Sequence, residues 1–139
     1  GEPQLAALGD ALKATDDKCR VILIHHPPSG PCKPRKRLLD AEAFREVIAK
    51  HGADLILHGH NHKALLSWID TKDGRTPVVG APSASIGHGW RDHPAEWRLF
   101  EISRIAGGYE IVMRRRRITT DNGVEDYGLF KLSSPQPHG

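Results

Sequence analysis

Three histidines stand in one short stretch of this chain, His58-Gly59-His60-Asn61-His62, directly after the apolar run Leu55-Ile56-Leu57. Such a run predicts a buried strand, which would deliver the three imidazoles into one loop. Neutral imidazole is the commonest side-chain ligand for Zn, Mn, Fe or Ni, and Gly59 lets the backbone turn without a Cβ near a bulky ion. The stretch therefore predicts a metal site.

A second apolar run, Val21-Ile22-Leu23-Ile24, ends in the same way, in His25-His26-Pro27-Pro28. In an open α/β sheet, ligands bind beyond the carboxyl ends of the strands, so we expect both histidine groups at one pocket. A single histidine such as His58 is more often a hydrogen-bonded core residue. His25, His60 and His62 together instead predict the metal ligands.

The residues around the two histidine groups predict the elements that position them. Leucines at helical spacing predict a helix over residues 3–15, and an apolar stripe predicts a second helix over residues 39–50 with Gly52 as its C-cap. Residues 27–37 contain four prolines and a glycine, which predicts a rigid loop. The order strand, loop, helix, strand over residues 21–57 is a βαβ unit, which places its two strands parallel with their carboxyl ends on one side.

After His62 the pattern changes to short strands separated by turns. Asp73-Gly74 and Gly107-Gly108 are hairpin signals, and Asp121-Asn122-Gly123 predicts a turn. The second half of the chain is therefore expected to be mostly antiparallel β. The expected strands are residues 64–69, 76–79, 97–102 and 109–117, and the expected disordered tail is residues 133–139.

Gly59-His60-Asn61-His62 resembles the G-H-x-H motif that closes the calcineurin-like metallophosphoesterase domain, and the strand followed by His-His-Pro-Pro resembles the motif that precedes it. The short spacing between the two motifs is similar to that of the cyclic-nucleotide phosphodiesterase-like branch. This resemblance covers residues 19–85. It implies that His25 and His60 bind one divalent ion and His62 binds another, in a four-layer α/β/β/α sandwich that hydrolyses phosphate esters.

The earlier motifs of that family, D-x-H, G-D and G-N-H-D/E, are absent. The single Gly-Asp pair, Gly9-Asp10, lies inside the expected first helix. We therefore expect residues 1–132 to be the C-terminal half of the sandwich, α/β (α+β) in class, with one βαβ unit followed by antiparallel strands. Such a half would leave one inner sheet face uncovered, and the catalytic histidine of the family would lie in the missing N-terminal half.

Five further residues are candidates for contacts with substrate or with the metal ligands. His26 would orient a carboxylate or touch substrate, or else hydrogen-bond to the backbone. Asn61 is expected to be a turn residue in the left-handed region rather than a chemical participant. Ser83 and Ser85 lie where the family has a loop that lines the pocket. His88 is a candidate for a metal or phosphate site, with an exposed loop histidine as the alternative.

The net charge is +3, and most of the positive excess lies in two clusters, residues 33–37 and 114–117. The first would attract a phosphorylated substrate, since a positive rim raises the rate of encounter with anions. The second continues an expected strand, so its arginines should point alternately to opposite faces of a solvated edge strand. Aromatic residues are only 6% and do not alternate with basic ones, which disfavours a nucleic-acid partner.

Two further features narrow the class of protein. No run approaches the ~18 apolar residues of a membrane helix, and no N-terminal signal pattern is present, so we expect a cytoplasmic protein with no membrane partner. Cys19 and Cys32 form no C-x-x-C pair and predict reduced thiols rather than a disulfide framework.

The expected function of the parent protein is metal-dependent hydrolysis of a phosphate ester, either a small molecule or a nucleotide. Two cations about 3.5–4 Å apart would activate a bridging water and hold the phosphoryl oxygens. The histidines supply only some of the ligands of such a centre. This chain should therefore bind at most one divalent ion, which would be Mn, Fe, Zn or Ni, and should have little activity alone. The alternative is a non-catalytic interaction module that forms a homodimer or pairs with a separate N-terminal half.

Overall fold

The two apolar runs that precede the histidines form neighbouring parallel strands, β1 (Val21–Ile24) and β2 (Leu55–His58). Helix α2 (Ala41–His51) lies between them in the chain, so the predicted βαβ unit is confirmed. The helix ends at Gly52, as predicted. This residue has a φ of 70° and donates its N–H to the Ile48 carbonyl at 2.8 Å.

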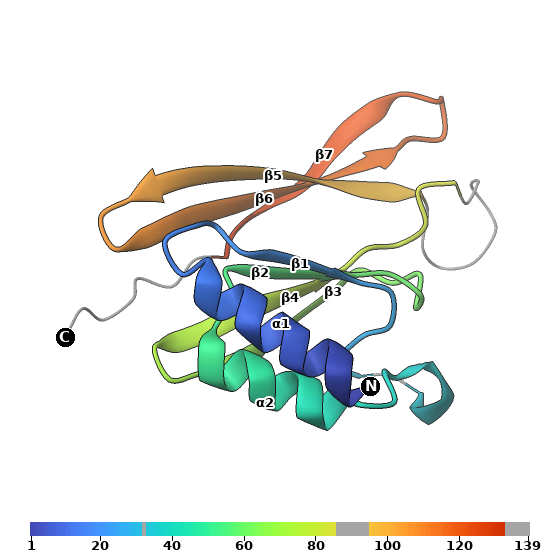
Figure 1. Ribbon diagram of the computed structural model, residues 1–139. Coiled ribbons are helices and arrows are strands. Elements are labelled where there is room, and N and C mark those ends of the chain that lie inside the picture. Colours follow the sequence, from blue (N-terminus) through green and yellow to red (C-terminus); the bar gives the residue numbers. More distant parts are fainter. Residues whose placement is uncertain (32, 86–94, 133–139) are drawn as a thin grey trace.

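The computed structural model describes residues 1–31, 33–85 and 95–132. This part of the chain has two helices and two sheets, a mixed α+β fold in three layers (Figure 1). The two helices cover one face of the four-stranded sheet, and the three-stranded sheet covers the other face (Figure 1). The remaining elements are α1 (Glu2–Ala14), the short 3-10 helix η1 (Pro34–Lys36), β3 (Leu65–Thr71), β4 (Gly74–Gly80), β5 (Glu96–Ile105), β6 (Gly108–Ile118) and β7 (Val124–Lys131).

The four-stranded sheet has the order β1-β2-β4-β3, with β4 parallel to β2 and β3 antiparallel to β4. The three-stranded sheet has the antiparallel order β5-β6-β7. Both predicted hairpins are confirmed, β3–β4 at Asp73-Gly74 and β5–β6 at Gly107-Gly108. Strand β7 follows the predicted turn but was not itself predicted, because Gly128 and an irregularity in its pairing with β6 interrupt the alternation of its side chains. The predicted tail, residues 133–139, lies outside the described residues.

The four-stranded sheet is buried on both faces. The helices cover one face, and the buried residues of that core are Leu12, Phe44, Ile48, Ala53, Ile56, Ile69 and Val78. The three-stranded sheet covers the other face, where the buried residues are Leu55, Val79, Ile111, Met113 and Leu132. The expectation of an uncovered inner face is therefore wrong, because the antiparallel strands of the second half fold back over the first sheet. The two edge strands are less covered: Leu23 and Val21 of β1 are 76% and 41% exposed, and Leu66 of β3 is 41% exposed.

The arginine cluster 114–117 lies in β6, the central strand of its sheet, so the predicted edge strand is wrong. Strands β5 and β7 flank it and carry the acidic partners that the local sequence of β6 does not reveal. The predicted alternation is confirmed. Arg114 and Arg116 share Asp126, each at 3.1 Å, whereas Arg115 and Arg117 bind Glu96 and Glu125. All four arginines of the cluster are thus ion-paired.

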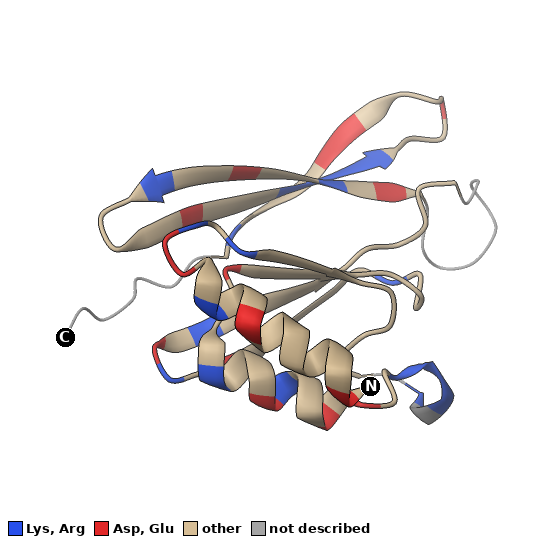
Figure 2. Cartoon of the chain, in the orientation of Figure 1, with Lys and Arg blue, Asp and Glu red and all other residues tan. Residues whose placement is uncertain are grey.

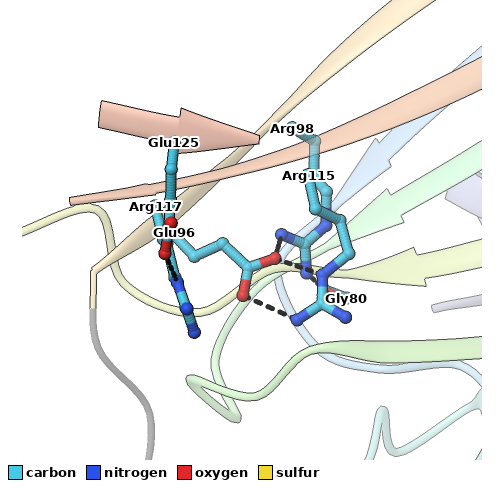
Figure 3. A network of polar contacts seen from close by, with 6 residues as sticks. All are labelled: Gly80, Glu96, Arg98, Arg115, Arg117 and Glu125. Carbon is cyan, nitrogen blue, oxygen red and sulfur yellow. Dashed lines mark hydrogen bonds and ion pairs between the residues drawn. The ribbon is translucent and has the colours of Figure 1, made fainter. Parts of the chain in front are cut away.

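Glu96, at the start of β5, is the buried centre of this network (Figure 3). It is 4% exposed and accepts hydrogen bonds from Arg98 and from both Nε and Nη2 of Arg115, the latter at 2.8 Å. Arg98 also donates to the Gly80 carbonyl at 3.5 Å, which links the second sheet to the end of β4. Burial raises the pKa of Glu96, but the hydrogen bond from Arg115 and the charges of both arginines outweigh it and hold the pKa below its usual value.

No helix within residues 1–31, 33–85 and 95–132 is both long enough and apolar enough to cross a membrane.

Glu96→Gln is expected to lower the free energy of unfolding by about 3 kcal/mol or more, because it leaves two guanidinium groups without their carboxylate. Denaturant unfolding at pH 7 measures this loss. Glu101→Gln is the matched control, because Glu101 is 60% exposed and lies 3.9 Å from Arg114. Its effect should stay within about 1 kcal/mol. Equal losses in the two variants would contradict the central role of Glu96.

The same variants give a pH test. A carboxylate whose pKa is lower in the folded state stabilises the fold above its unfolded pKa, and this contribution disappears as the pH falls through the folded pKa. The difference in unfolding free energy between the unsubstituted protein and Glu96→Gln should therefore be constant above about pH 5 and shrink below about pH 4. A difference that does not change with pH would contradict the direction of the pKa shift.

Candidate metal centre

Strands β1 and β2 end side by side, and this brings the two histidine groups together. Ile24 pairs with His58 in the parallel register, so the loops that carry His25 and His60 begin at neighbouring positions. The Gly59 N–H donates to the His25 carbonyl at 3.2 Å and ties the two loops to each other. Across this junction His25 Nε2 lies 3.0 Å from His60 Nδ1.

Three imidazoles converge at this point: His25, His26 and His60. One ring nitrogen of each lies within 4.8 Å of the corresponding atoms of the other two. The ring centroids are 4.9 Å apart for His25 and His26, 4.9 Å for His25 and His60, and 4.4 Å for His26 and His60. His25 is exposed, whereas His26 and His60 are half-buried. A small ligand therefore has access to the cluster from the His25 side.

The set of three differs from the one that the sequence predicts. His62 is exposed and does not belong to the group whose ring nitrogens lie within 4.8 Å of one another, whereas His26 does. On a continuing strand His25 and His26 would point to opposite faces. Strand β1 stops at Ile24, however, and the chain bends at the two histidines, so both rings reach the same side. The sequence signal for this bend is the pair of prolines that directly follows the two histidines.

The loop after β2 has an unusual backbone. His60 has a φ of 61° and His62 a φ of 52°, so both lie in the left-handed region, where a residue with a Cβ is uncommon. Asn61, predicted to occupy that region, lies between them without a positive φ. Its N–H donates to the Gly59 carbonyl at 2.7 Å. Such backbone positions occur most often at functional sites, where the surrounding structure holds them.

The loop after β1 is anchored at its base. Pro27 and Pro28 are buried, and Arg45 of α2 donates to the Pro28 carbonyl at 3.1 Å. One residue further on, the hydroxyls of Ser29 and Ser67 of β3 lie 2.8 Å apart. These contacts hold His25 and His26 on a backbone with little freedom to move, which is what a preorganised ligand set requires.

The electrostatics of the cluster keep His60 neutral. Partial removal from solvent lowers its pKa, and the charges of His26, His25, Lys36 and His62 lower it further. An imidazole must be neutral to bind a metal ion, so this shift favours ligation over protonation.

His58 is a core residue, as predicted for a single histidine. It is 5% exposed, burial lowers its pKa, and its Nδ1 lies 3.1 Å from the Gly59 carbonyl oxygen. Its other nitrogen, Nε2, is buried and finds no hydrogen-bond partner among the described residues. The ring lies against Gly80, the cross-strand neighbour of His58 on β4.

The remaining candidates lie apart from the three imidazoles. Ser83 and Ser85 follow β4, at the same edge of the sheet, with their hydroxyls 3.2 Å apart, and neither belongs to the ligand cluster. His88 and Cys32 lie outside the described residues, and Cys19 carries a free thiol. Within the described part of the chain, no carboxylate or thiol joins the three imidazoles within 4.8 Å.

Comparison of the chain with models of protein families and with curated proteins finds no match. Proposals about its chemistry therefore rest on the residues and geometry of the site.

Gly80→Ala is expected to destabilise the protein by about 1–3 kcal/mol, because the new methyl group collides with a ring that cannot retreat. A Cβ at Gly80 would lie 2.6 Å from Cε1 and 2.8 Å from Nε2 of His58. Gly59→Ala is the matched control, since a Cβ there has no neighbour within 4 Å. Thermal unfolding compares the two, and a similar shift in both would contradict the close packing of His58 on β4.

Proposed function

We propose that His25, His26 and His60 bind one divalent transition-metal ion, and that this ion belongs to a phosphoesterase centre of the calcineurin-like type. The main support for the proposal is that three ring nitrogens lie within 4.8 Å of one another at the carboxyl ends of two parallel strands. Ligands of open α/β sheets bind at this edge.

The donor set fits Zn²⁺ in geometry and in chemistry. Two nitrogens bound at about 2.0–2.1 Å to a tetrahedral ion lie about 3.3 Å apart. His25 Nε2 and His60 Nδ1 are 3.0 Å apart, and the ligand nitrogens of the set lie within 4.8 Å of one another, so the rings need to move together by no more than about 1.5 Å. Three protein ligands leave one coordination position open for water or substrate, as in catalytic zinc sites. Mn, Fe and Ni also accept imidazole and remain candidates for the bound ion.

The charge of the ligands favours an anionic substrate. Three neutral imidazoles leave the full 2+ charge of the ion uncompensated, and a phosphate ester would supply the missing negative charge. A divalent ion in this site would polarise a phosphoryl oxygen and lower the pKa of water nearby. The lowered pKa of His60 favours the neutral imidazole, which has one unprotonated ring nitrogen available for the ion. The substrate class is therefore a small phosphate ester or a nucleotide.

The finer assignment of the fold is also a proposal. The layers helix, sheet and sheet correspond to three consecutive layers of an α/β/β/α sandwich (Figure 1). Leu99 of β5 and Leu129 of β7 flank Arg114 in the same row of the sheet and are 45% and 62% exposed. They offer an apolar surface on which a fourth layer would pack.

A second candidate function, an interaction module, is favoured by the open edge of β1. This strand pairs only with β2 among the described residues, and Leu23 and Val21 are exposed beside its free edge. Unpaired backbone groups and exposed apolar side chains make such an edge a template for another strand. A strand added there would end beside His25 and bring its own side chains to the metal centre.

Metal content tests the site. Dialysed protein should contain close to one equivalent of Zn²⁺, and His26→Ala and His60→Ala should each lose it, because two imidazoles bind the ion much more weakly than three. His62→Ala is the control that separates the two ligand sets, and it should keep the ion. Loss of metal in His62→Ala with retention in His26→Ala would overturn the ligand set and restore His62 as a ligand.

Hydrolysis of bis(p-nitrophenyl) phosphate in the presence of Mn²⁺ or Zn²⁺ tests the reaction. The described ligand set holds one ion and contains no carboxylate, so turnover should be far below the ~10 s⁻¹ of a typical enzyme and should vanish in His60→Ala. Activity that persists in His60→Ala would show that the reaction takes place elsewhere and would reject the proposed centre.

Sedimentation velocity at several protein concentrations tests the interaction module. If β1 pairs with β1 of a second copy, the protein should dimerise as its concentration rises, and Leu23→Lys should abolish the dimer by placing a charge on the edge strand. Leu129→Lys, on the outer face of the other sheet, is the control and should leave the dimer intact. A monomer at every concentration would reject self-association through this edge.

A further inference from the structure

A basic loop stands beside the three imidazoles. It carries Lys33, Arg35, Lys36 and Arg37. Figure 2 shows this part of the chain in blue, near the N-terminus. The Leu38 N–H donates to the Pro27 carbonyl at 3.4 Å, so both ends of the loop lie next to His26. The turn at η1, where the Lys36 N–H donates to the Lys33 carbonyl at 2.8 Å, gathers the charges into a small space.

The loop differs from the other basic cluster of this chain in one respect. In β6 every arginine from 114 to 117 is paired with a carboxylate. Across residues 1–31, 33–85 and 95–132, no carboxylate pairs with Arg35, Lys36 or Arg37. The nearest acidic residue in the chain, Asp40, is engaged by the N-terminal amine at 3.0 Å. The positive charges of Arg35, Lys36 and Arg37 are therefore available to an external anion.

Lys36 is the member of the loop that faces the protein. Its side chain is half-buried, whereas Arg35 and Arg37 are exposed. The backbone bond between Leu38 and Pro27 places Lys36, two residues before Leu38, in the segment that returns to the chain next to His26. Of the basic residues in the loop that the structure describes, Lys36 is therefore the one best placed to contact an anion at the histidine site.

We propose that the loop of residues 33–37 is the substrate-recognition arm of the histidine site, and that it selects phosphate esters that carry at least one further phosphate group. The assignment of these anions as substrates rests on the proposed function, whereas their binding to the loop does not. Lys36 contacts the phosphate nearest the imidazoles, and the exposed arginines contact the next one.

The number of charges favours a polyphosphorylated ligand over a simple diester. A phosphodiester carries one negative charge, which a divalent ion in the histidine site already balances. Cations within about 10 Å of one another act on a ligand together at moderate salt, so a second phosphate gains from the whole loop. Tryptophan, tyrosine and phenylalanine are absent from residues 27–38, which leaves no stacking platform for the bases of a single strand.

Isothermal titration of metal-free protein with inorganic tripolyphosphate tests the proposal, with inorganic phosphate as the comparison. Tripolyphosphate should bind more tightly than phosphate, and its affinity should fall as salt is added. Lys36→Gln should weaken the binding about tenfold to a hundredfold, the loss typical of one charge-assisted contact. Lys13→Gln, which removes the same charge from the last turn of α1, is the control and should bind normally.

Three results would overturn the proposal: no binding of tripolyphosphate, equal weakening in Lys36→Gln and Lys13→Gln, or tighter Lys36-dependent binding of a single-stranded oligonucleotide. Because Lys36 is on a loop, its substitution should not unfold the protein, and an unchanged unfolding temperature verifies this. The double variant Arg35→Gln/Arg37→Gln gives an independent check and should weaken tripolyphosphate more than phosphate.

The proposed metal site and the proposed role of the loop can be rejected independently of each other. His60→Ala should lose metal but keep tripolyphosphate binding, because the loop does not depend on the ion. If the unsubstituted protein binds no metal yet shows Lys36-dependent binding of tripolyphosphate, the proposed function fails and the recognition arm stands. If it binds metal but Lys36→Gln has no effect on tripolyphosphate, the recognition arm alone is rejected.

Discussion

The parallel pairing of β1 with β2 is the constraint on which the candidate site depends. Because Ile24 and His58 are partners in the register, the chain leaves both strands at neighbouring positions, and the imidazoles of three histidines meet there. The register itself is stabilised by burial, since Leu55 and Ile56 of β2 are buried on opposite faces of the sheet. A slip of one residue would turn the end of the strand to the other face. Hydrophobic packing of the strands thereby fixes the positions at which the two histidine loops begin.

The second sheet makes this burial possible. It closes the face of the first sheet that the helices leave open, and the network around Glu96 joins it to the end of β4 through the contact between Arg98 and Gly80. A carboxylate that is removed from solvent and shared by two guanidinium groups is stable only when it accepts hydrogen bonds from them. Glu96 accepts such hydrogen bonds from Arg115. The same interaction that stabilises the sandwich thus also supports the edge of the sheet on which the histidines lie.

Two clusters of basic residues that look alike in the sequence have different surroundings in the fold. The arginines of β6 are balanced by acidic residues from the two flanking strands, so their charge contributes to structure. Within the described part of the chain, no carboxylate pairs with Arg35, Lys36 or Arg37 of the loop, so these three charges are open to an external anion. The loop therefore adds positive charge next to the segment that carries His25 and His26. This charge, together with the three imidazoles proposed as metal ligands, is the electrostatic basis for proposing an anionic substrate.

The sequence by itself determined the βαβ unit, the hairpins and the meeting of two histidine groups, because apolar periodicity and turn residues are local signals and the edge rule for parallel strands is general. Only the tertiary structure decided that His26 rather than His62 joins His25 and His60, because the orientation of a ring beyond a strand depends on where the chain bends. It also decided that β6 is a central strand whose arginines are neutralised. Their acidic partners lie on the neighbouring strands, and which strands are neighbours follows from packing rather than from local pattern.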